Sequence, residues 1–406
     1  MLREPSGTSR EGQSTAGWIA PLQREPVVRS GLLSAVLDRL RDLRNHQVAD
    51  PSFRRWASRF PLTRPFARRQ AKALFDLTAG FVYSQVLSAA VRVRLFELLA
   101  PGPLDPDTLA LRMALPPEGA LRLLRGATAL RLVEPRSDGR YALGSLGAAL
   151  VGSPGVTAMI AHHDMLYRDL ADPVALLAGE SDAELGRYWS YAGDRKPGCG
   201  SLRPTRDPAD YTALMAASQD LIAAEILDAY PIGRHRRLLD VGGGDGSFLV
   251  AAAKAAPDLQ LGLFDLPPVV SIARAKILAA GLSGRTTISS GDFLSDALPE
   301  AADLITLNRV LHDHDDAAAL AILRQVRHAI APGGTLLVAE PMAETPGAEA
   351  SGDAYFGFYL LAMGQGRPRT SNEIMAMLRA VGFSRCRLLT TSTPLIARMA
   401  IGRALA

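Results

Sequence analysis

Cysteine is scarce in this sequence: the 406 residues include two, Cys199 and Cys386, and they form no CxxC pair. This scarcity argues against a disulfide framework and against a zinc site, and it suits a reducing compartment. The N-terminus lacks the basic start, apolar stretch and cleavage site of a signal peptide. No uncharged apolar run reaches the roughly 18 residues of a membrane span. We therefore expect a cytoplasmic protein that holds no metal ion.

Charge is moderate overall but unevenly distributed. Hydrophobic residues make up 48% of the chain and charged residues 21%, as in a soluble globular protein. Residues 1–75 hold 14 Lys and Arg against 6 Asp and Glu, whereas the remainder holds 31 against 35. Within residues 52–72 the arginines alternate with the aromatic residues Phe53, Trp56, Phe60 and Phe66. This composition suits an anionic membrane surface, nucleic acid, or a helical extension that packs on a partner subunit.

The N-terminal half reads as mainly helical. Helical periodicity begins near residues 32–44 and continues in a long apolar segment at 73–100. Residues 104–147 predict a helix, a turn, a second helix and a short two-stranded ribbon, which is the order of a winged helix. The second helix offers only Arg122 and Arg125 to a DNA groove and is otherwise apolar. We therefore expect it to pack against another subunit, and we expect no nucleic-acid partner.

Predicted strands and helices alternate from residue 236 onward. Alternation of this kind produces an α/β domain with a mostly parallel sheet and helices on both faces. Ligands bind such sheets at the carboxyl ends of the strands. Strands are predicted at 236–241, 259–266, 286–293, 302–310, 335–342, 385–391 and 394–401, with helices near 209–230, 247–256, 269–281 and 316–330.

A glycine-rich turn, LLDVGGGDGS at 238–247, follows the first of these strands. A dinucleotide fingerprint reads GxGxxG, and here Ser247 stands where its third small residue is expected. Asp240 lies two residues before Gly242 at the strand end. A carboxylate there would repel a pyrophosphate at the helix N-terminus and would attract a cationic group such as an ammonium.

Two further strands also end in acids. Asp265 ends the next strand, about 20 residues on, where an acid accepts hydrogen bonds from ribose hydroxyls. Asp292 ends the third and is followed by Phe293, a pair that suits the amino group and ring of adenine. Any one of these acids alone would read as a helix cap or turn former. Three acids at successive strand ends together predict a site for S-adenosylmethionine.

The sequence resembles the class I O-methyltransferases of the caffeic-acid and hydroxyneurosporene type over roughly residues 75–406. The motifs that carry the resemblance are LLDVGGGDGSF, LFDLP, GDF, RVLHDHDD, LRQVRHAIAPGGTLLVAEP and GRPRTSNEIMAMLRAVGF. The resemblance implies a homodimer with a winged-helix dimerisation domain and a Rossmann-like catalytic domain. It leads us to divide the chain into a basic, partly disordered extension at 1–75, a dimerisation domain at 76–185 and a catalytic domain at 186–406.

The resemblance also implies which residues act. The cofactor would be S-adenosyl-L-methionine, with S-adenosyl-L-homocysteine as product and no metal. His312 matches the catalytic base of the family, and Asp313 and Glu340 match acids that hold its imidazole. The residues implied to bind the cofactor are Met215, Asp240, Gly242, Gly244, Asp265, Leu266, Asp292, Phe293 and Asn308.

Three positions depart from the family pattern. Asn308 stands where plant members usually have a lysine, and His314 stands where a tryptophan usually lies beside the cofactor. Pro368 occupies the place of a glutamate that often precedes the RT of the late loop. The departures leave the reaction class intact and bear on the geometry around His312.

The acceptor is expected to be a lipophilic small molecule. Large apolar residues predominate in its expected wall, although each could equally belong to the core or a dimer interface. The expected wall residues are Met159, His162, His163, Leu166, Phe358, Tyr359 and Met363.

The pattern at 59–87 resembles bacterial hydroxyneurosporene methyltransferases of the spheroidene pathway, which methylate the tertiary 1-hydroxyl of acyclic carotenoids. This resemblance implies contact with the photosynthetic membrane through the basic segment. A bacteriochlorophyll precursor, a phenolic polyketide, and a regulator that binds S-adenosylmethionine or DNA without methylating stay open as alternatives.

Overall fold

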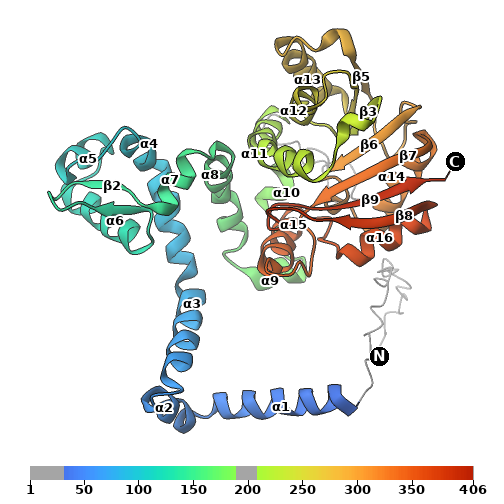
Figure 1. Cartoon of the computed structure of the whole chain (residues 1–406). Coiled ribbons are helices and arrows are strands. Elements are labelled where there is room, and N and C mark those ends of the chain that lie inside the picture. Colours follow the sequence, from blue (N-terminus) through green and yellow to red (C-terminus); the bar gives the residue numbers. More distant parts are fainter. Residues whose placement is uncertain (1–31, 189–207, 406) are drawn as a thin grey trace, which may run out of the picture. The chain divides into compact units, whose positions relative to one another are not determined.

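The computed structural model describes residues 32–188 and 208–405 (Figure 1). The segment at 1–30, which was expected to be disordered, lies outside the described residues. So does nearly all of the Gly- and Pro-containing segment near 193–208, including Cys199. The chain divides into two compact units at Phe81 and Val82, and each is described by itself. The domain boundaries expected at 75/76 and 185/186 stay predictions.

From residue 32 onward, the first unit has three helices: α1 (Leu32–Ala49), α2 (Pro51–Arg59) and α3 (Arg64–Arg92). The last turns of α3 belong to the second unit. Helix α2 begins where the Asp50 carboxylate accepts a hydrogen bond from the backbone N–H of Ser52. Helix α3 is long and apolar enough to cross a membrane by length and composition, which differs from the sequence expectation. Many core helices of soluble proteins pass the same test.

The second unit begins with the winged helix that the sequence predicted. Its small core contains Leu95, Leu109 and Leu124, all fully buried. The ribbon is antiparallel, with Val133 opposite Leu143. Arg122 and Arg125 lie on the exposed side of the second helix. The elements are α4 (Leu95–Leu99), α5 (Pro106–Arg112), α6 (Pro117–Ala129), β1 (Val133–Pro135), β2 (Tyr141–Leu143) and α7 (Ser145–Val151).

In the described part of residues 154–229, four helices precede the large sheet: α8 (Pro154–Asp169), α9 (Pro173–Ala178), α10 (Glu184–Tyr188) and α11 (Pro208–Ala229). The Asp169 carboxylate accepts hydrogen bonds from the backbone N–H groups of Glu184 and Leu185, which fixes the start of α10 against α8. Helix α8 packs along α11.

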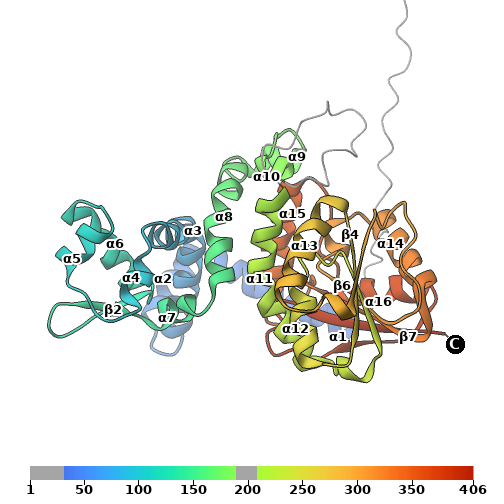
Figure 2. The same cartoon turned by 90° about the horizontal axis from the view of Figure 1, so that it is seen from above.

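The sheet has seven strands in the order β5-β4-β3-β6-β7-β9-β8, and β3 to β7 are parallel. Adjacent leucines serve opposite faces: Leu238 packs with α11, α12 and α13, whereas Leu239 packs with α14 and α16. Figure 2 shows these helices on the two sides of the sheet. The strands are β3 (Arg237–Val241), β4 (Gln260–Asp265), β5 (Thr286–Ser290), β6 (Ala302–Asn308), β7 (Ile330–Glu340), β8 (Phe383–Leu389) and β9 (Arg398–Ala404); the helices are α12 (Ser247–Ala255), α13 (Pro267–Ala279), α14 (Asp316–Ala329), α15 (Gly357–Met363) and α16 (Ser371–Ala380).

The predicted α/β class is therefore confirmed, and the main differences lie at element ends. Strand β7 begins at Ile330, five residues before the predicted start, and β9 begins at Arg398 rather than 394. A π-helix at Ala350–Phe356 and the helix α16 carry no assignment in the sequence analysis. The start of α16 has a readable signal, because Thr370 and Glu373 form a capping box.

Candidate active site

The glycine turn joins β3 to α12 at the carboxyl edge of the sheet. The backbone at Gly242 has φ of +70°, and a Cβ there would lie 2.8 Å from a methyl of Val310. The N–H of Gly244 donates to the Asp265 carboxylate at 2.8 Å. The structure therefore brings Gly242, Gly244 and Asp265 together, and glycine is needed for the tight approach of the chain.

Asp240 and Asp265 form a buried acidic pair beneath this turn. Asp240 is 1% exposed and accepts hydrogen bonds from Thr306 Oγ1 at 2.6 Å and Asn308 Nδ2 at 3.0 Å. Burial raises the pKa of Asp240 to about 7, and the charge of Asp265 adds to the rise. Burial likewise raises the pKa of Asp265 to about 6. A cationic ligand with hydroxyl donors would compensate both carboxylates.

Asn308 adds a buried acceptor at the end of β6. Its Nδ2 is bound to Asp240, whereas its Oδ1 is buried and has no hydrogen-bond partner in the structure. Buried polar atoms are nearly always paired, so this oxygen is suited to a ligand donor. The asparagine that departs from the family pattern thus lies directly against the acidic pair.

Of the remaining residues predicted for the cofactor, Leu266, Asp292 and Phe293 lie around the same edge. Asp292 follows β5, and its carboxylate accepts from the N–H of Leu294 at 2.9 Å. The ring of Phe293 meets the ring of His314 edge to face at 5.5 Å. Leu266 is the N-cap residue of α13. Met215 lies on α11, and its side chain is outside the described part of the structure.

His312 lies on the short turn Leu311–Asp313 between β6 and α14. Its Nε2 is 3.1 Å from an Asp313 carboxylate oxygen, and its Nδ1 is 3.9 Å from Oε1 of Glu340. Burial opposes a charge on the imidazole, but Asp313 and then Glu340 outweigh burial and raise the pKa of His312. Glu340 Oε1 also accepts the N–H groups of Leu311 and His312, at 2.5 and 3.2 Å. The two acids predicted to hold the imidazole therefore both lie against it.

Two arginines of the late loop hold this turn, and neither was predicted from the sequence to have a role. The buried Arg369 donates to the carbonyl oxygens of Leu311 at 2.6 Å and His314 at 2.8 Å, and to Asp316 at 2.9 Å. Arg367 donates from its backbone N–H to the carbonyl of His312 at 2.9 Å. The only signal in the sequence was the motif GRPRT, in which these residues flank Pro368.

The expected acceptor wall contains two histidine–tyrosine pairs. His162 Nε2 lies 3.1 Å from the hydroxyl of Tyr359, and His163 Nε2 lies 2.7 Å from that of Tyr355. Burial lowers the pKa of His163 and raises that of Tyr355.

The wall residues divide into two groups by burial. Leu166, Tyr359 and Met363 belong to a buried cluster between α8, α10 and α15, whereas Met159 and Phe358 are half-buried and lie outside it. Phe356, which the sequence analysis did not select, connects the wall to the predicted base, because its ring centroid is 6.2 Å from that of His312.

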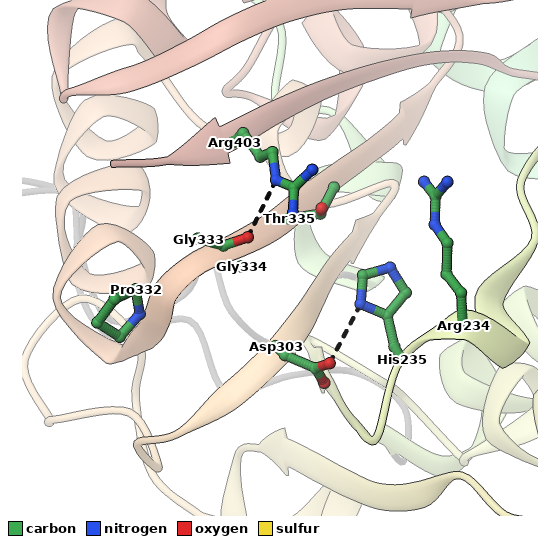
Figure 3. Close-up of a pocket in the computed structure, with 8 residues that line it drawn as sticks. All are labelled: Arg234, His235, Asp303, Pro332, Gly333, Gly334, Thr335 and Arg403. Atoms are coloured by element: carbon green, nitrogen blue, oxygen red, sulfur yellow. Dashed lines mark hydrogen bonds and ion pairs between the residues drawn. The ribbon is translucent and has the colours of Figure 1, made fainter. Parts of the chain in front are cut away.

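A separate hollow of about 340 Å³ lies at the opposite, amino edge of the sheet (Figure 3). In it His235 points toward Asp303 at 3.4 Å, and Arg403 binds the carbonyl of Gly333 at 3.1 Å. None of the residues predicted for the site lines this hollow. Among residues 32–188 and 208–405, no group of three His, Cys, Asp or Glu side chains is arranged to hold a metal ion.

Comparison with known families decides the class. An O-methyltransferase domain model matches residues 167–384, and an O-methyltransferase dimerisation domain model matches residues 75–153. The chain belongs to the O-methyltransferase family. It is an S-adenosylmethionine-dependent O-methyltransferase with an N-terminal dimerisation domain, as the resemblance implied.

The matches to named relatives cover most of the length of this methyltransferase. The chain is 42% identical over 373 residues to demethylspheroidene O-methyltransferase of Cereibacter sphaeroides. This match covers 92% of this chain and 96% of the relative. It is 33% identical to acetylserotonin O-methyltransferase of Mus musculus, over 82% of this chain and 88% of the relative.

Solved structures share the fold. The apo structure of the S-adenosylmethionine-dependent methyltransferase SibL has a TM-score of 0.66 and 27% identity, over 82% of this chain and 99% of that one. Human N-acetylserotonin methyltransferase in complex with SAM has a TM-score of 0.67 and 24% identity, over 83% of this chain and 98% of that one.

Proposed function

We propose that this O-methyltransferase transfers the methyl group of S-adenosylmethionine to the tertiary 1-hydroxyl of acyclic carotenoids of the demethylspheroidene type. The observation that carries the proposal is the 42% identity to the Cereibacter sphaeroides enzyme along nearly the whole of both chains. The half-buried, largely apolar wall of Met159, Phe356 and Phe358 supports a lipophilic acceptor.

The residues present fit S-adenosylmethionine. The buried carboxylates of Asp240 and Asp265 suit its ammonium group and ribose hydroxyls, and the free Oδ1 of Asn308 adds an acceptor beside them. Asp292 and Phe293 lie along the same edge, at the place expected for adenine. Bound S-adenosylmethionine supplies an activated methyl group for in-line displacement.

The contribution of the chain to the reaction is to orient the acceptor and take its proton. A tertiary alcohol is far less acidic than a phenol, whose pKa is about 10 in tyrosine. The hydroxyl proton must therefore pass to His312 while the oxygen forms its new bond to carbon. Asp313 and Glu340 stabilise the imidazolium that results, because both lie within 4 Å of the ring nitrogens.

The test is methyl transfer from labelled S-adenosylmethionine, with a detergent-solubilised 1-hydroxy acyclic carotenoid, a bacteriochlorophyllide and a phenol supplied in parallel. We expect label in the carotenoid as a methyl ether. His312→Ala should lose on the order of 100-fold to 10,000-fold in kcat, with cofactor affinity by calorimetry unchanged. A variant that keeps most of its activity would refute the base and leave positioning as the mechanism. Label in the phenol alone would favour the activity that the Mus musculus relative is named for.

We also propose that the protein acts as a homodimer in the cytoplasm, does not bind nucleic acid, and works at the surface of the membrane that holds its acceptor. The dimerisation domain supports the homodimer. Vesicle binding tests the membrane contact, and the size of the particle in solution tests the homodimer.

A further inference from the structure

The segment Pro51–Lys72, called here the basic arm, comprises α2 and the start of α3 in the first unit (blue in Figure 1). It contains six arginines and one lysine, at 54, 55, 59, 64, 68, 69 and 72, and no acidic residue. All seven of these side chains are exposed. A soluble surface normally mixes both signs of charge, so the basic arm is complementary to a polyanion.

Large apolar side chains are exposed among these cations. The exposed fractions are 51% for Trp56, 39% for Phe60, 79% for Leu62 and 77% for Phe66. The rings of Trp56 and Phe60 stack at 5.1 Å. Arg55 and Arg59 line an open hollow of about 640 Å³ with the same two rings. Cations and exposed aromatic rings in one short segment are the composition of a segment that lies in a membrane interface.

The dimerisation domain accounts for a different part of α3. Its match begins at residue 75, so the exposed Leu77 and Phe81 lie inside the region associated with a partner subunit. The basic arm ends before that match begins. We therefore assign the apolar half of α3 to the partner subunit rather than to a membrane span.

We propose that the basic arm binds the surface of an anionic lipid bilayer, with its arginines at the headgroups and with Trp56, Phe60 and Phe66 at the boundary of the acyl chains. This inference rests on the proposed lipophilic acceptor, because such a molecule is dissolved in the bilayer and must be reached from its surface. Charge complementarity identifies the occupant as anionic lipid, and the apolar rings distinguish it from a soluble anion.

Co-sedimentation of the full-length protein with vesicles tests the proposal. We expect binding to phosphatidylcholine vesicles that contain phosphatidylglycerol and weak binding to phosphatidylcholine alone. Each arginine near such a surface contributes about 1 kcal/mol, so the double variant Arg55→Ala/Arg59→Ala should bind about 30-fold more weakly. The matched control, Arg385→Ala/Arg387→Ala, removes the same charge from exposed positions on β8 and should bind like the unmodified protein.

Fluorescence locates the contact. The chain has three tryptophans, and replacing Trp18 and Trp189 by phenylalanine leaves Trp56 as the sole reporter. Its emission should shift to the blue when anionic vesicles are added. Absence of a shift, or an equal loss of binding in the Arg385/Arg387 control, would overturn the proposal. The proposal would also fail if the main defect of the Arg55/Arg59 double variant were dissociation of the dimer. It would fail as well if duplex DNA displaced the protein from vesicles at physiological salt.

Activity separates this inference from the proposed function. The Arg55/Arg59 double variant should turn over a detergent-solubilised carotenoid at the normal rate and a vesicle-embedded one more slowly. If the unmodified protein binds vesicles but methylates no carotenoid, the proposed substrate fails while the membrane surface stands.

Discussion

Replacing Gly366 by alanine tests whether the late loop sets the position of His312. Gly366 has φ of +81°, and a Cβ there would lie 2.2 Å from the carbonyl oxygen of His312 and 2.7 Å from the carbonyl carbon of Asp313. Contacts below 3.0 Å are essentially never found for a real Cβ, so the turn must move by about 3.0 − 2.2 = 0.8 Å. A misplacement of about 1 Å can cost on the order of 100-fold in rate.

Gly366→Ala also introduces backbone strain, which lowers stability and needs a separate control. Alanine in the left-handed region is strained by roughly 1–2 kcal/mol. Gly281→Ala isolates that strain, because Gly281 has φ of +71° and no atom within 4 Å of its would-be Cβ. Both variants should lose thermal stability through this strain, and Gly366→Ala should lose more because the turn must also move. Only Gly366→Ala should lose about 100-fold in kcat.

The assay is single-turnover methyl transfer at saturating cofactor, with cofactor affinity measured by calorimetry. The residues proposed to bind the cofactor follow β3 to β6, so affinity should stay within a few-fold of normal. Equal kcat in Gly366→Ala and Gly281→Ala would refute the reasoning, because the contact between the late loop and the turn would then not position the histidine.

Two further predictions concern protons. Asp313→Asn removes the charge that most raises the pKa of His312 against burial, so the acidic limb of kcat against pH should move to lower pH; an unmoved limb would contradict the assignment. Burial raises the pKa of Asp240 to about 7 and that of Asp265 to about 6, so binding of the cationic cofactor at about pH 6 should release protons. Calorimetry in buffers of different ionisation enthalpy measures the number of protons released. Asp240→Asn should reduce that number. The stability contribution of both acids is lost as pH rises through these values, so the cofactor should raise Tm more at neutral than at acidic pH.

The sheet and its acidic edge were predictable because their signals are local. Three of the parallel strands, β3, β4 and β5, have an acid within one or two residues of their ends: Asp240, Asp265 and Asp292. The strand order then brings these ends to one edge without further information. The start of β7 was less predictable because Pro332 and two glycines interrupt it.

The support of His312 was not predictable because it is tertiary. Arg369 is separated by 58 residues from Leu311 and by 55 from His314, and it binds their carbonyl oxygens rather than their side chains. Backbone acceptors leave no trace in the residue types of the turn. The sequence therefore selected His312, Asp313 and Glu340, which the structure brings together, and only the structure identifies the arginines that hold the turn.

The expected acceptor wall contains residues of two kinds, which residue type alone does not distinguish. Leu166, Tyr359 and Met363 are large and apolar because they fill a buried cluster, and their side chains are already in contact with protein. Met159 and Phe358 are half-buried and keep surface for a ligand. Substitutions to alanine in the first group should therefore lower stability by about 2–5 kcal/mol, whereas those in the second should raise KM for the proposed acceptor with little change in stability. If Met363→Ala changes KM and leaves Tm unaltered, the division between core and wall is wrong.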